Sequence, residues 1–477
     1  MELELRGHDY RYAVEQALMA YLPEEAADCR LVSALNGDTA SALLTVSGTT
    51  VSGESRLREP LPEDALLRKR ALQKLVKESV FAAATALCGK APPWGSLTGV
   101  RPGKLAARRL RSNGRDKSEA AAWLVSEYRL SPVRAGLCAD AALVGLETAD
   151  LLAENDIILY VGIPFCPTRC AYCSFVSHSV EKSLKLVEPY VDALCGEMVS
   201  AGRLCREAGL RVRAVYWGGG TPTTLSEDQL RRTLGTLEAN FDLSANLEYT
   251  VEAGRPDTIS REKLLALRDY GVGRISINPQ TMEDSVLRAI GRRHSAQDIR
   301  DGYRLARETF DAQINMDLIA GLPADSTDGF QRSLDEVLSL DPENVTVHTL
   351  TRKRGADLNS MELRGLDGET VGAMLDYALS VLPGSGFAPY YLYRQKFSAG
   401  GYENVGWTKE NAVCRYNVAM MEELCSVLSL GAGGATKRML PGGKILRCFN
   451  RKYPYEYIGA REAADAEKRA LFLNEVR

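Results

Sequence analysis

From residue 155 onward, short β-branched runs alternate with amphipathic helical segments, and this alternation limits the fold more than any other feature. We predict strands at 157–163, 212–217, 247–252, 273–277, 313–318 and 344–349. The segments between them carry helix start signals, such as the capping box formed by Ser226 and Gln229. Six strand–helix repeats predict a parallel sheet covered by helices, closed or partly closed like a barrel. In such folds, functional residues gather at the carboxyl ends of the strands.

Three cysteines follow the first predicted strand. Cys166, Cys170 and Cys173 form a Cys-x3-Cys-x2-Cys pattern in what should be a loop. A cubane iron–sulfur cluster normally takes four cysteine thiolates, so three thiols would leave one iron open, as catalytic metal sites leave a position free for substrate. The alternative is a structural zinc loop, which needs a second pair of Cys or His ligands. No second Cys-x2-Cys or His-x3-His pair occurs in the sequence, which favours the cluster.

The cysteine pattern, with Tyr172 before the third cysteine, resembles the signature of the radical S-adenosylmethionine (SAM) enzymes. The preceding segment Tyr160-Val-Gly-Ile-Pro-Phe165 is similar to the oxygen-independent coproporphyrinogen III oxidase group. The long N-terminal extension is similar to the HemZ-type branch of that group, the coproporphyrinogen dehydrogenases. The resemblance covers roughly residues 155–450. It implies an α/β fold built on a partial (β/α)6 radical-SAM barrel.

We predict three domains: an N-terminal α+β extension at 1–153, the barrel at 154–369 and a small C-terminal α/β region at 370–477. The N-terminal signals are a strand at 1–6, a helix at 10–22, a hairpin at Asn36-Gly37 and helices at about 62–89 and 131–152. The turn-rich segment 94–102 is predicted to be a packed connector. The basic run 104–117 is predicted to be a solvated helix face, with substrate docking as the alternative.

The composition is that of a globular protein, with 45% hydrophobic and 25% charged residues and a net charge of −3. This charge gives no indication of sequence-independent nucleic-acid binding. The chain has eleven cysteines but opens without a secretory signal, so we expect a cytoplasmic protein with reduced thiols. No apolar run approaches the roughly 18–20 residues that span a bilayer, so no membrane span is predicted.

The resemblance also implies a SAM site. The glycine motif Gly218-Gly-Gly220, after the second predicted strand, would hold the methionyl amino group, because glycine lets a ligand approach the backbone. Arg292 matches an arginine that engages the cofactor carboxylate, and Thr351 should lie near the adenine. The full set of expected SAM contacts is Tyr160, Tyr172, Gly219, Gly220, Thr221, Glu252, Gln280, Arg292, Asp317 and Thr351. For any one of these residues, a purely structural role is the alternative.

The implied reaction is the oxygen-independent oxidative decarboxylation of coproporphyrinogen III to protoporphyrinogen IX in haem biosynthesis. A [4Fe-4S] cluster and SAM would generate a 5′-deoxyadenosyl radical, with electrons from a reductant such as flavodoxin or ferredoxin. No general acid–base pair is required and none is evident, so no catalytic residue is assigned. The substrate carboxylates would bind arginine and lysine. Arg352–Arg354 and Arg394–Lys396 are the candidates, with solvated charges as the alternative.

Two positions depart from the oxidases: Gly162 stands in place of a histidine, and Phe175 in place of a further cysteine. Two other functions therefore stay open. The first is the haem chaperone branch, whose His-Asn-x-x-Tyr-Trp segment corresponds here to Cys414-Arg-Tyr-Asn417, which leaves Cys414 as the candidate haem ligand. The second is a radical SAM enzyme with another substrate. The glycine-rich turn at 430–436 is interpreted as tight packing near the site.

Overall fold

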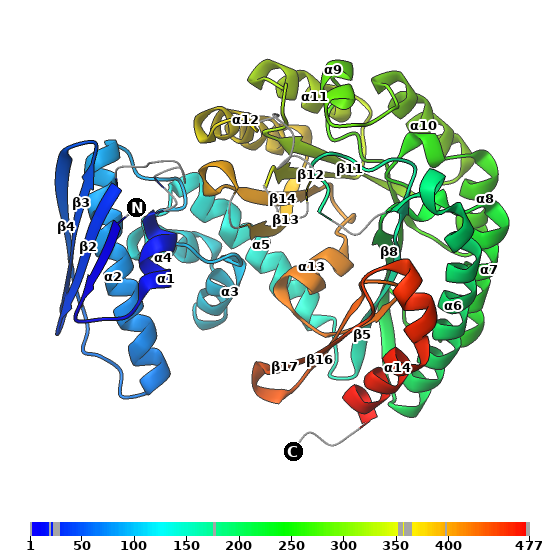
Figure 1. The fold of residues 1–477 in the computed structure, drawn as a ribbon, viewed down its shortest axis with the longest axis horizontal. Coiled ribbons are helices and arrows are strands. Elements are labelled where there is room, and N and C mark those ends of the chain that lie inside the picture. Colours follow the sequence, from blue (N-terminus) through cyan, green and yellow to red (C-terminus); the bar gives the residue numbers. More distant parts are fainter. Residues whose placement is uncertain are drawn as a thin grey trace. The chain divides into compact units, whose positions relative to one another are not determined.

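The computed structural model describes residues 2–18, 21, 29–174, 178–351, 356, 365–395 and 398–473. The chain divides into two compact units (Figure 1). The first consists of Met1–Ala139 with Gly400–Tyr402, and the second of Asp140–Ala399 with Glu403–Arg477. The three-domain division, with its boundaries after residues 153 and 369, stays a prediction.

The first unit is a small sheet with helices. Its elements are β1 (Glu2–Arg6), α1 (Arg11–Leu18), β2 (Cys29–Asn36), β3 (Thr39–Val46), β4 (Thr49–Arg56), α2 (Ala65–Cys88), α3 (Gly103–Ser112) and α4 (Lys117–Tyr128). Strand β1 pairs parallel with β2, whereas β2, β3 and β4 form an antiparallel meander. Leu31 and Leu44 of the sheet are fully buried together with Val76 and Val80 of α2. The core of this unit therefore lies between the sheet and α2.

Local signals account for the ends of α2. The Asp64 side chain accepts a hydrogen bond from the Leu67 N–H, and Gly89 follows the last turn in the left-handed conformation, with a φ of 69°. The predicted helix at 62–89 is thus confirmed. The connector after α2 is packed as expected: Trp94 is buried, and a Cβ added to Gly95 would lie 2.1 Å from the Tyr128 carbonyl oxygen.

The second unit contains the predicted strand–helix repeats. Its parallel strands are β5 (Asp156–Ile163), β8 (Arg211–Gly219), β9 (Glu248–Glu252), β10 (Arg274–Ser276), β11 (Gln313–Ala320) and β12 (Asn344–Thr349). The accompanying helices are α6 (Val180–Glu207), α7 (Glu227–Asn240), α8 (Arg261–Asp269), α9 (Asp284–Ala289), α10 (Ala296–Thr309) and α11 (Thr327–Ser339). Helix α5 (Pro132–Asp150) begins in the first unit and ends in the second. Figure 1 shows α6, α7, α8 and α10 along the outside of the curved sheet. The strands form an open, partial barrel, which confirms the predicted fold class.

The C-terminal region adds strands to both edges of this sheet. Its elements are α12 (Gly368–Val381), β13 (Ala388–Arg394), β14 (Glu403–Thr408), α13 (Arg415–Glu422), β15 (Ser426–Leu430), β16 (Ala435–Met439), β17 (Ile445–Phe449) and α14 (Pro454–Leu473). Strand β14 pairs antiparallel with β12, and β15 pairs parallel with β5. In the described residues the resulting sheet has eleven strands, in the order β13-β14-β12-β11-β10-β9-β8-β5-β15-β16-β17.

A buried carboxylate joins the last helix to the barrel. Glu197 of α6 is fully buried and forms an ion pair with Lys468 of α14, which is 2% exposed as a side chain. Asn450 donates a hydrogen bond of 2.8 Å to the same carboxylate, and the Gly431 N–H donates one of 2.7 Å. Buried charges need such partners. Glu197 therefore links α6, α14 and the glycine-rich turn after β15.

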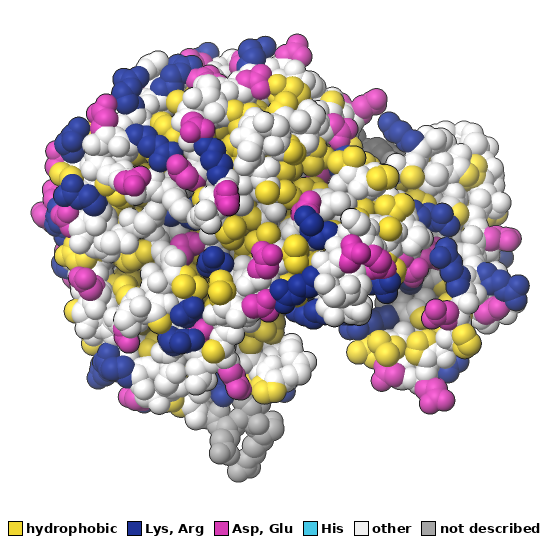
Figure 2. Space-filling model, turned by 180° about the vertical axis from the view of Figure 1, so that it is seen from behind, with side chains coloured by type: hydrophobic (Ala, Val, Ile, Leu, Met, Phe, Trp, Pro, Cys, Tyr) yellow, Lys and Arg dark blue, Asp and Glu magenta, His cyan; other side chains and the backbone are white. Residues whose placement is uncertain are grey.

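The surface has no single charge sign on the face drawn in Figure 2. Lysine and arginine side chains are interspersed there with aspartate and glutamate, as the net charge of −3 suggests. Within the described ranges, no helix combines the length and the apolar composition needed to cross a bilayer.

Candidate active site

The three predicted cluster ligands lie in one loop after β5. Cys166 belongs to the short strand β6 (Phe165–Cys166), which pairs through its backbone with β7 (His178–Ser179). Cys170 is buried, and the Cys173 N–H donates a hydrogen bond of 3.0 Å to its carbonyl oxygen. Burial, together with the neighbouring thiols Cys170 and Cys173, raises the pKa of Cys166 to about 11.

Two buried arginines surround Cys170. Arg255, just after β9, is 2% exposed and donates from Nη1 to the Cys170 sulfur at 3.8 Å and from Nη2 to Thr168 Oγ1 at 3.0 Å. Burial opposes the thiolate of Cys170, but the charges of Arg292 and Arg255 outweigh it and hold the pKa of this thiol below its usual range. Arg255 carried no functional prediction. Its position, three residues after the end of a strand that carries Glu252, was the available signal.

The glycine motif lies against the cysteine loop. The Gly220 N–H donates to the Ile163 carbonyl oxygen at 2.7 Å, and the Thr221 N–H donates to that of Phe165 at 2.8 Å. A Cβ added to Gly220 would lie only 2.5 Å from the Phe165 oxygen, so a larger residue would push the two segments apart. The Thr221 hydroxyl also lies 3.5 Å from the Cys166 sulfur. The structure thus brings Cys166, Gly220 and Thr221 together.

Glu252 ends β9 beside a group of tyrosines. The Tyr216 hydroxyl donates a hydrogen bond of 2.6 Å to Glu252, and the Tyr216 ring stacks on Tyr416 at 4.2 Å and on Tyr160 at 6.5 Å between ring centres. Burial raises the pKa of Glu252 to about 7, although the hydrogen bond from Tyr216 acts in the opposite direction. A cofactor ammonium or hydroxyl donor would stabilise the carboxylate form here.

Tyr172, Gln280 and Arg292 meet at the end of β10. The Tyr172 hydroxyl donates to Gln280 Oε1 at 3.0 Å, and Arg292 donates from Nη2 to that hydroxyl at 3.3 Å. Gln280 has a φ of 69°, a left-handed conformation that is uncommon for residues other than glycine and recurs at functional sites. Backbone hydrogen bonds from Gln280 to Asp317 and from Ile319 to Gln280 fix this conformation.

Asp317 lies on β11, next to a histidine and a tyrosine. Asn315 donates a hydrogen bond of 2.7 Å to its carboxylate, and His348 Nε2 lies 3.6 Å from Oδ2. The Tyr393 hydroxyl is in turn 3.4 Å from His348 Nδ1. Burial opposes the charged form of Asp317, but His348 and Asn315 outweigh burial and hold the pKa below its usual range. His348 and Tyr393 carried no functional prediction, since only the tertiary structure shows them beside Asp317.

Of the remaining predicted positions, Thr351 and Arg394 lie at or just after strand ends. Thr351 follows β12 and forms an isolated antiparallel bridge with Ser398. Arg394, a candidate for the substrate carboxylates, is the last residue of β13. The other candidates, Arg352–Arg354 and Lys396, lie outside the described residues, as does Phe175.

The candidate haem ligand Cys414 does not face an open site. Its thiol is buried at the start of α13 and donates a hydrogen bond of 2.9 Å to Glu248. Burial of the Cys414 thiol argues against its use as a haem ligand.

The glycine-rich turn after β15 is tightly packed, as expected. Gly431 has a φ of 87°, and a Cβ there would lie 2.3 Å from the Gly162 carbonyl oxygen.

The cysteine loop suits a multinuclear cluster. In the part of the chain that the structure describes, no three His, Cys, Asp or Glu side chains converge on a point that would hold one metal ion. Three thiolates of a [4Fe-4S] cluster bind three separate irons, so they need not converge in this way. Cys166, Cys170 and Cys173 form no disulfide bonds, and the arginines beside Cys170 would offset the negative charge of a bound cluster.

Known proteins are similar to this chain in sequence, and one solved structure is similar to it in fold. The model of the radical SAM superfamily matches residues 160–337. The oxygen-independent coproporphyrinogen-III oxidase-like protein HemZ of Bacillus subtilis is 38% identical over 370 residues, which cover 76% of this chain and 74% of HemZ. The heme chaperone HemW of the same organism is 36% identical over 192 residues, covering 40% of this chain and 49% of HemW. The solved structure of the radical SAM enzyme HemN, the coproporphyrinogen III oxidase of Escherichia coli, is similar with a TM-score of 0.53 and 22% identity, over 68% of this chain and 73% of HemN.

Proposed function

The chain belongs to the radical SAM superfamily, in the group that includes HemZ, and from this we propose that it is an oxygen-independent coproporphyrinogen dehydrogenase. Its cofactors are the [4Fe-4S] cluster and SAM of the superfamily. When bound, these supply the 5′-deoxyadenosyl radical that removes a hydrogen atom from a propionate side chain. The observation that supports the proposal is the contact between the cysteine loop and the glycine motif, where the Thr221 hydroxyl lies 3.5 Å from the Cys166 sulfur.

In this proposal the residues of the site bind and orient the cofactors. Cys166, Cys170 and Cys173 hold the cluster. The backbone of Gly219–Thr221 would bind the amino-acid part of SAM, and Tyr160, Tyr172 and Gln280 would also contact the cofactor. The charged contacts would be Arg292 with the SAM carboxylate and Glu252 or Asp317 with its ammonium and hydroxyl donors, because charge-assisted hydrogen bonds are the stronger ones. Thr351 would lie near the adenine.

The protein's remaining task is to keep the reacting groups close and water away. Tyr160, Tyr216 and Tyr416 form a stacked aromatic group beside Glu252, and such a surface excludes water from the strand ends. The proposal also includes an electron donor such as flavodoxin or ferredoxin, and a cytoplasmic location.

The direct test is an anaerobic reaction of the reconstituted protein with SAM, a strong reductant and coproporphyrinogen III, followed by mass spectrometry. We expect 5′-deoxyadenosine together with a product lighter by two carbon dioxide molecules and four hydrogen atoms. The Cys170→Ala variant should form neither compound. Deoxyadenosine with unchanged porphyrinogen would contradict the dehydrogenase and direct the search to another substrate.

The second candidate is a haem chaperone. The similarity to HemW favours it, and the HemW of Escherichia coli is 26% identical over 303 residues, covering 64% of this chain and 76% of that protein. The buried thiol of Cys414 counts against the haem ligand that the sequence suggested. Titration of the protein with haem, followed by its absorbance, separates the candidates: tight haem binding without porphyrinogen turnover would favour the chaperone.

A further inference from the structure

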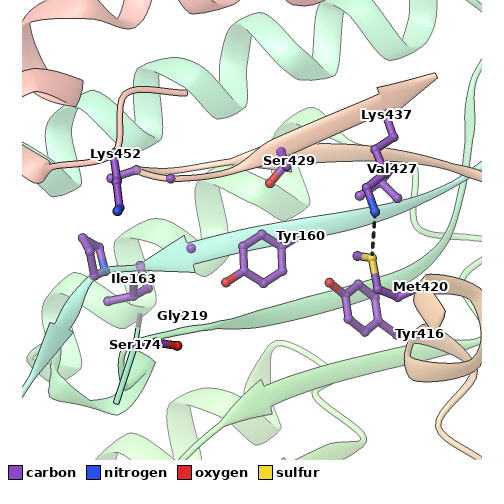
Figure 3. Close-up of a pocket in the computed structure, with 15 residues that line it drawn as sticks. Tyr160, Ile163, Ser174, Gly219, Tyr416, Met420, Val427, Ser429, Lys437 and Lys452 are labelled. Atoms are coloured by element: carbon purple, nitrogen blue, oxygen red, sulfur yellow. Dashed lines mark hydrogen bonds between the residues drawn. The ribbon is translucent and has the colours of Figure 1, made fainter. Parts of the chain in front are cut away.

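The second unit contains a cavity of about 340 Å³, and most of its lining residues are not among the proposed cofactor contacts. Figure 3 shows it between Tyr160 of β5, Ser429 of β15 and Lys437 of β16, with Tyr416 and Lys452 at its sides. The volume is in the range of small-molecule sites. Its walls are brought together by the pairing of β15 with β5 and of β16 with β15.

The charge of the cavity favours an anionic ligand. Among the described residues, its lining includes Lys437 and Lys452 but no aspartate or glutamate. The Lys437 ammonium lies 3.7 Å from the Met420 sulfur at the wall of the cavity (Figure 3). A ligand carboxylate would accept charge-assisted hydrogen bonds from lysine ammonium groups.

Ser429 gives a second, independent indication of a ligand. Its side chain is 1% exposed, yet its hydroxyl has no hydrogen-bond partner among the described residues. A buried polar group without a partner is costly, so it calls for an explanation such as an additional water or ligand. In Figure 3 this hydroxyl is on the side of β15 that faces Tyr160. A polar group of a ligand in the cavity would pair with it.

The aromatic wall and the glycine motif define the rest of the ligand. The rings of Tyr160 and Tyr416 are stacked, with centres 6.4 Å apart, and planar or pyrrolic rings pack well on such surfaces. Tyr160 and Gly219 line the cavity and are also among the proposed SAM contacts. A molecule in the cavity would therefore lie directly beside the cofactor, where a reacting side chain has to be.

We propose that this cavity is the carboxylate-binding subsite for the tetrapyrrole. Lys437 and Lys452 pair with propionate carboxylates, Ser429 hydrogen-bonds to one of them, and a ring packs against Tyr160 and Tyr416. The inference rests on the proposed function, because it takes a tetrapyrrole as the substrate. Coproporphyrinogen and haem both carry propionate carboxylates, which the lysines could bind in either molecule. The experiment below distinguishes these two ligands.

The test measures equilibrium binding to the reconstituted protein by absorbance and fluorescence. The probes are coproporphyrin III, its tetramethyl ester and haem. We expect the wild type to bind coproporphyrin III at least tenfold more tightly than the ester, because only the acid pairs with lysine. Lys437→Met and Lys452→Met should each weaken coproporphyrin binding about tenfold and leave ester binding unchanged. Lys444→Met, an exposed position on the turn between β16 and β17, is the matched control and should bind like the wild type.

A second measurement uses the unaltered protein and so does not depend on the folding of variants. Lysines are acylated with and without coproporphyrin III and mapped by mass spectrometry, and Lys437 and Lys452 should be protected while Lys444 is not. The subsite would be overturned if the wild type bound coproporphyrin III and neither lysine variant weakened this binding. It would also be overturned if coproporphyrin III bound without protecting Lys437 and Lys452 from acylation. Neither result would contradict the proposed function. Failure of the wild type to bind coproporphyrin would overturn the proposed function. If haem alone bound and the lysine variants weakened it, the subsite would belong to a haem-binding protein.

Discussion

The guanidinium of Arg255 lies against the sulfur of Cys170, with 3.8 Å between Nη1 and Sγ. Asp257 holds the same guanidinium from the other side at 3.2 Å, and Arg292 adds a second positive charge near this thiol. A thiolate, and the cluster that it would bind, gains stability from buried cations at this distance. We therefore expect Arg255 to position Cys170 and to balance the charge of a cluster at this site.

Replacing Arg255 should therefore loosen the cluster. We expect Arg255→Leu to lose iron to a chelator about tenfold faster than the wild type, since a hydrogen bond to a charged group contributes about 1.5–3 kcal/mol. Arg255→Lys should show an intermediate rate, because it keeps the charge without the forked geometry. Arg261→Leu removes an exposed arginine, paired with Glu308, and serves as the control. Equal rates in all variants would refute a role of Arg255 at the cluster.

Each of the three cysteines of the loop should be indispensable for the cluster. Cys166→Ala, Cys170→Ala and Cys173→Ala are each expected to abolish both the iron–sulfur absorbance and SAM cleavage, because a cluster with only two protein ligands is not held. Cys88→Ala removes an exposed thiol at the end of α2 and should leave the absorbance unchanged. Absorbance that survives in all three loop variants would mean that other residues bind the cluster.

Asp317 should contribute to SAM binding without contributing to the cluster. Asp317→Asn keeps the shape of the side chain but removes the charge that its environment stabilises. We expect about tenfold weaker SAM binding by calorimetry, the size typical of one charge-assisted hydrogen bond, with unchanged iron content. Asp335→Asn, at an exposed carboxylate bonded to Tyr377, is the control. Unchanged affinity in Asp317→Asn would exclude this residue from the site.

Glu252 should make the stability of the protein depend on pH. Its pKa is about 7 in the folded protein, above the ordinary 4.5. The folded protein therefore keeps a proton that the unfolded chain releases between these values, so raising the pH over this range favours unfolding, by up to about 3 kcal/mol. Denaturant unfolding at about pH 5 and pH 7.5 should show a larger stability loss for the wild type than for Glu252→Gln, which does not titrate. Parallel losses would contradict the raised pKa.

The buried pair Lys468–Glu197 should matter more than an exposed pair on the same helix. Lys468→Met leaves the Glu197 carboxylate buried without its cation, which typically costs about 3–5 kcal/mol. Arg469→Ala removes only an exposed pair with Glu207 and should cost less than about 1 kcal/mol. Denaturant unfolding measures both, and similar losses would show that α14 is not held by the buried charge.

The sequence by itself determined the strand–helix repeats, the cysteine loop and the glycine motif. These features depend on residues that are close together in the chain. Hydrophobic periodicity and turn residues are such local signals. They placed the six predicted strands where the structure has β5 and β8–β12. The polar strand ends were predictable for the same reason, since parallel strands bring their carboxyl ends to one edge.

Only the tertiary structure decided which distant residues meet. It brings Arg255 to Cys170 across 85 positions of the chain, and it pairs β14 with β12 and β15 with β5, so that C-terminal strands extend both edges of the barrel sheet. The second pairing brings Ser429 and Lys437 to Tyr160 and forms the cavity. No local pattern encodes such contacts, because they depend on the order of strands in the sheet and on the packing of side chains far apart in the sequence.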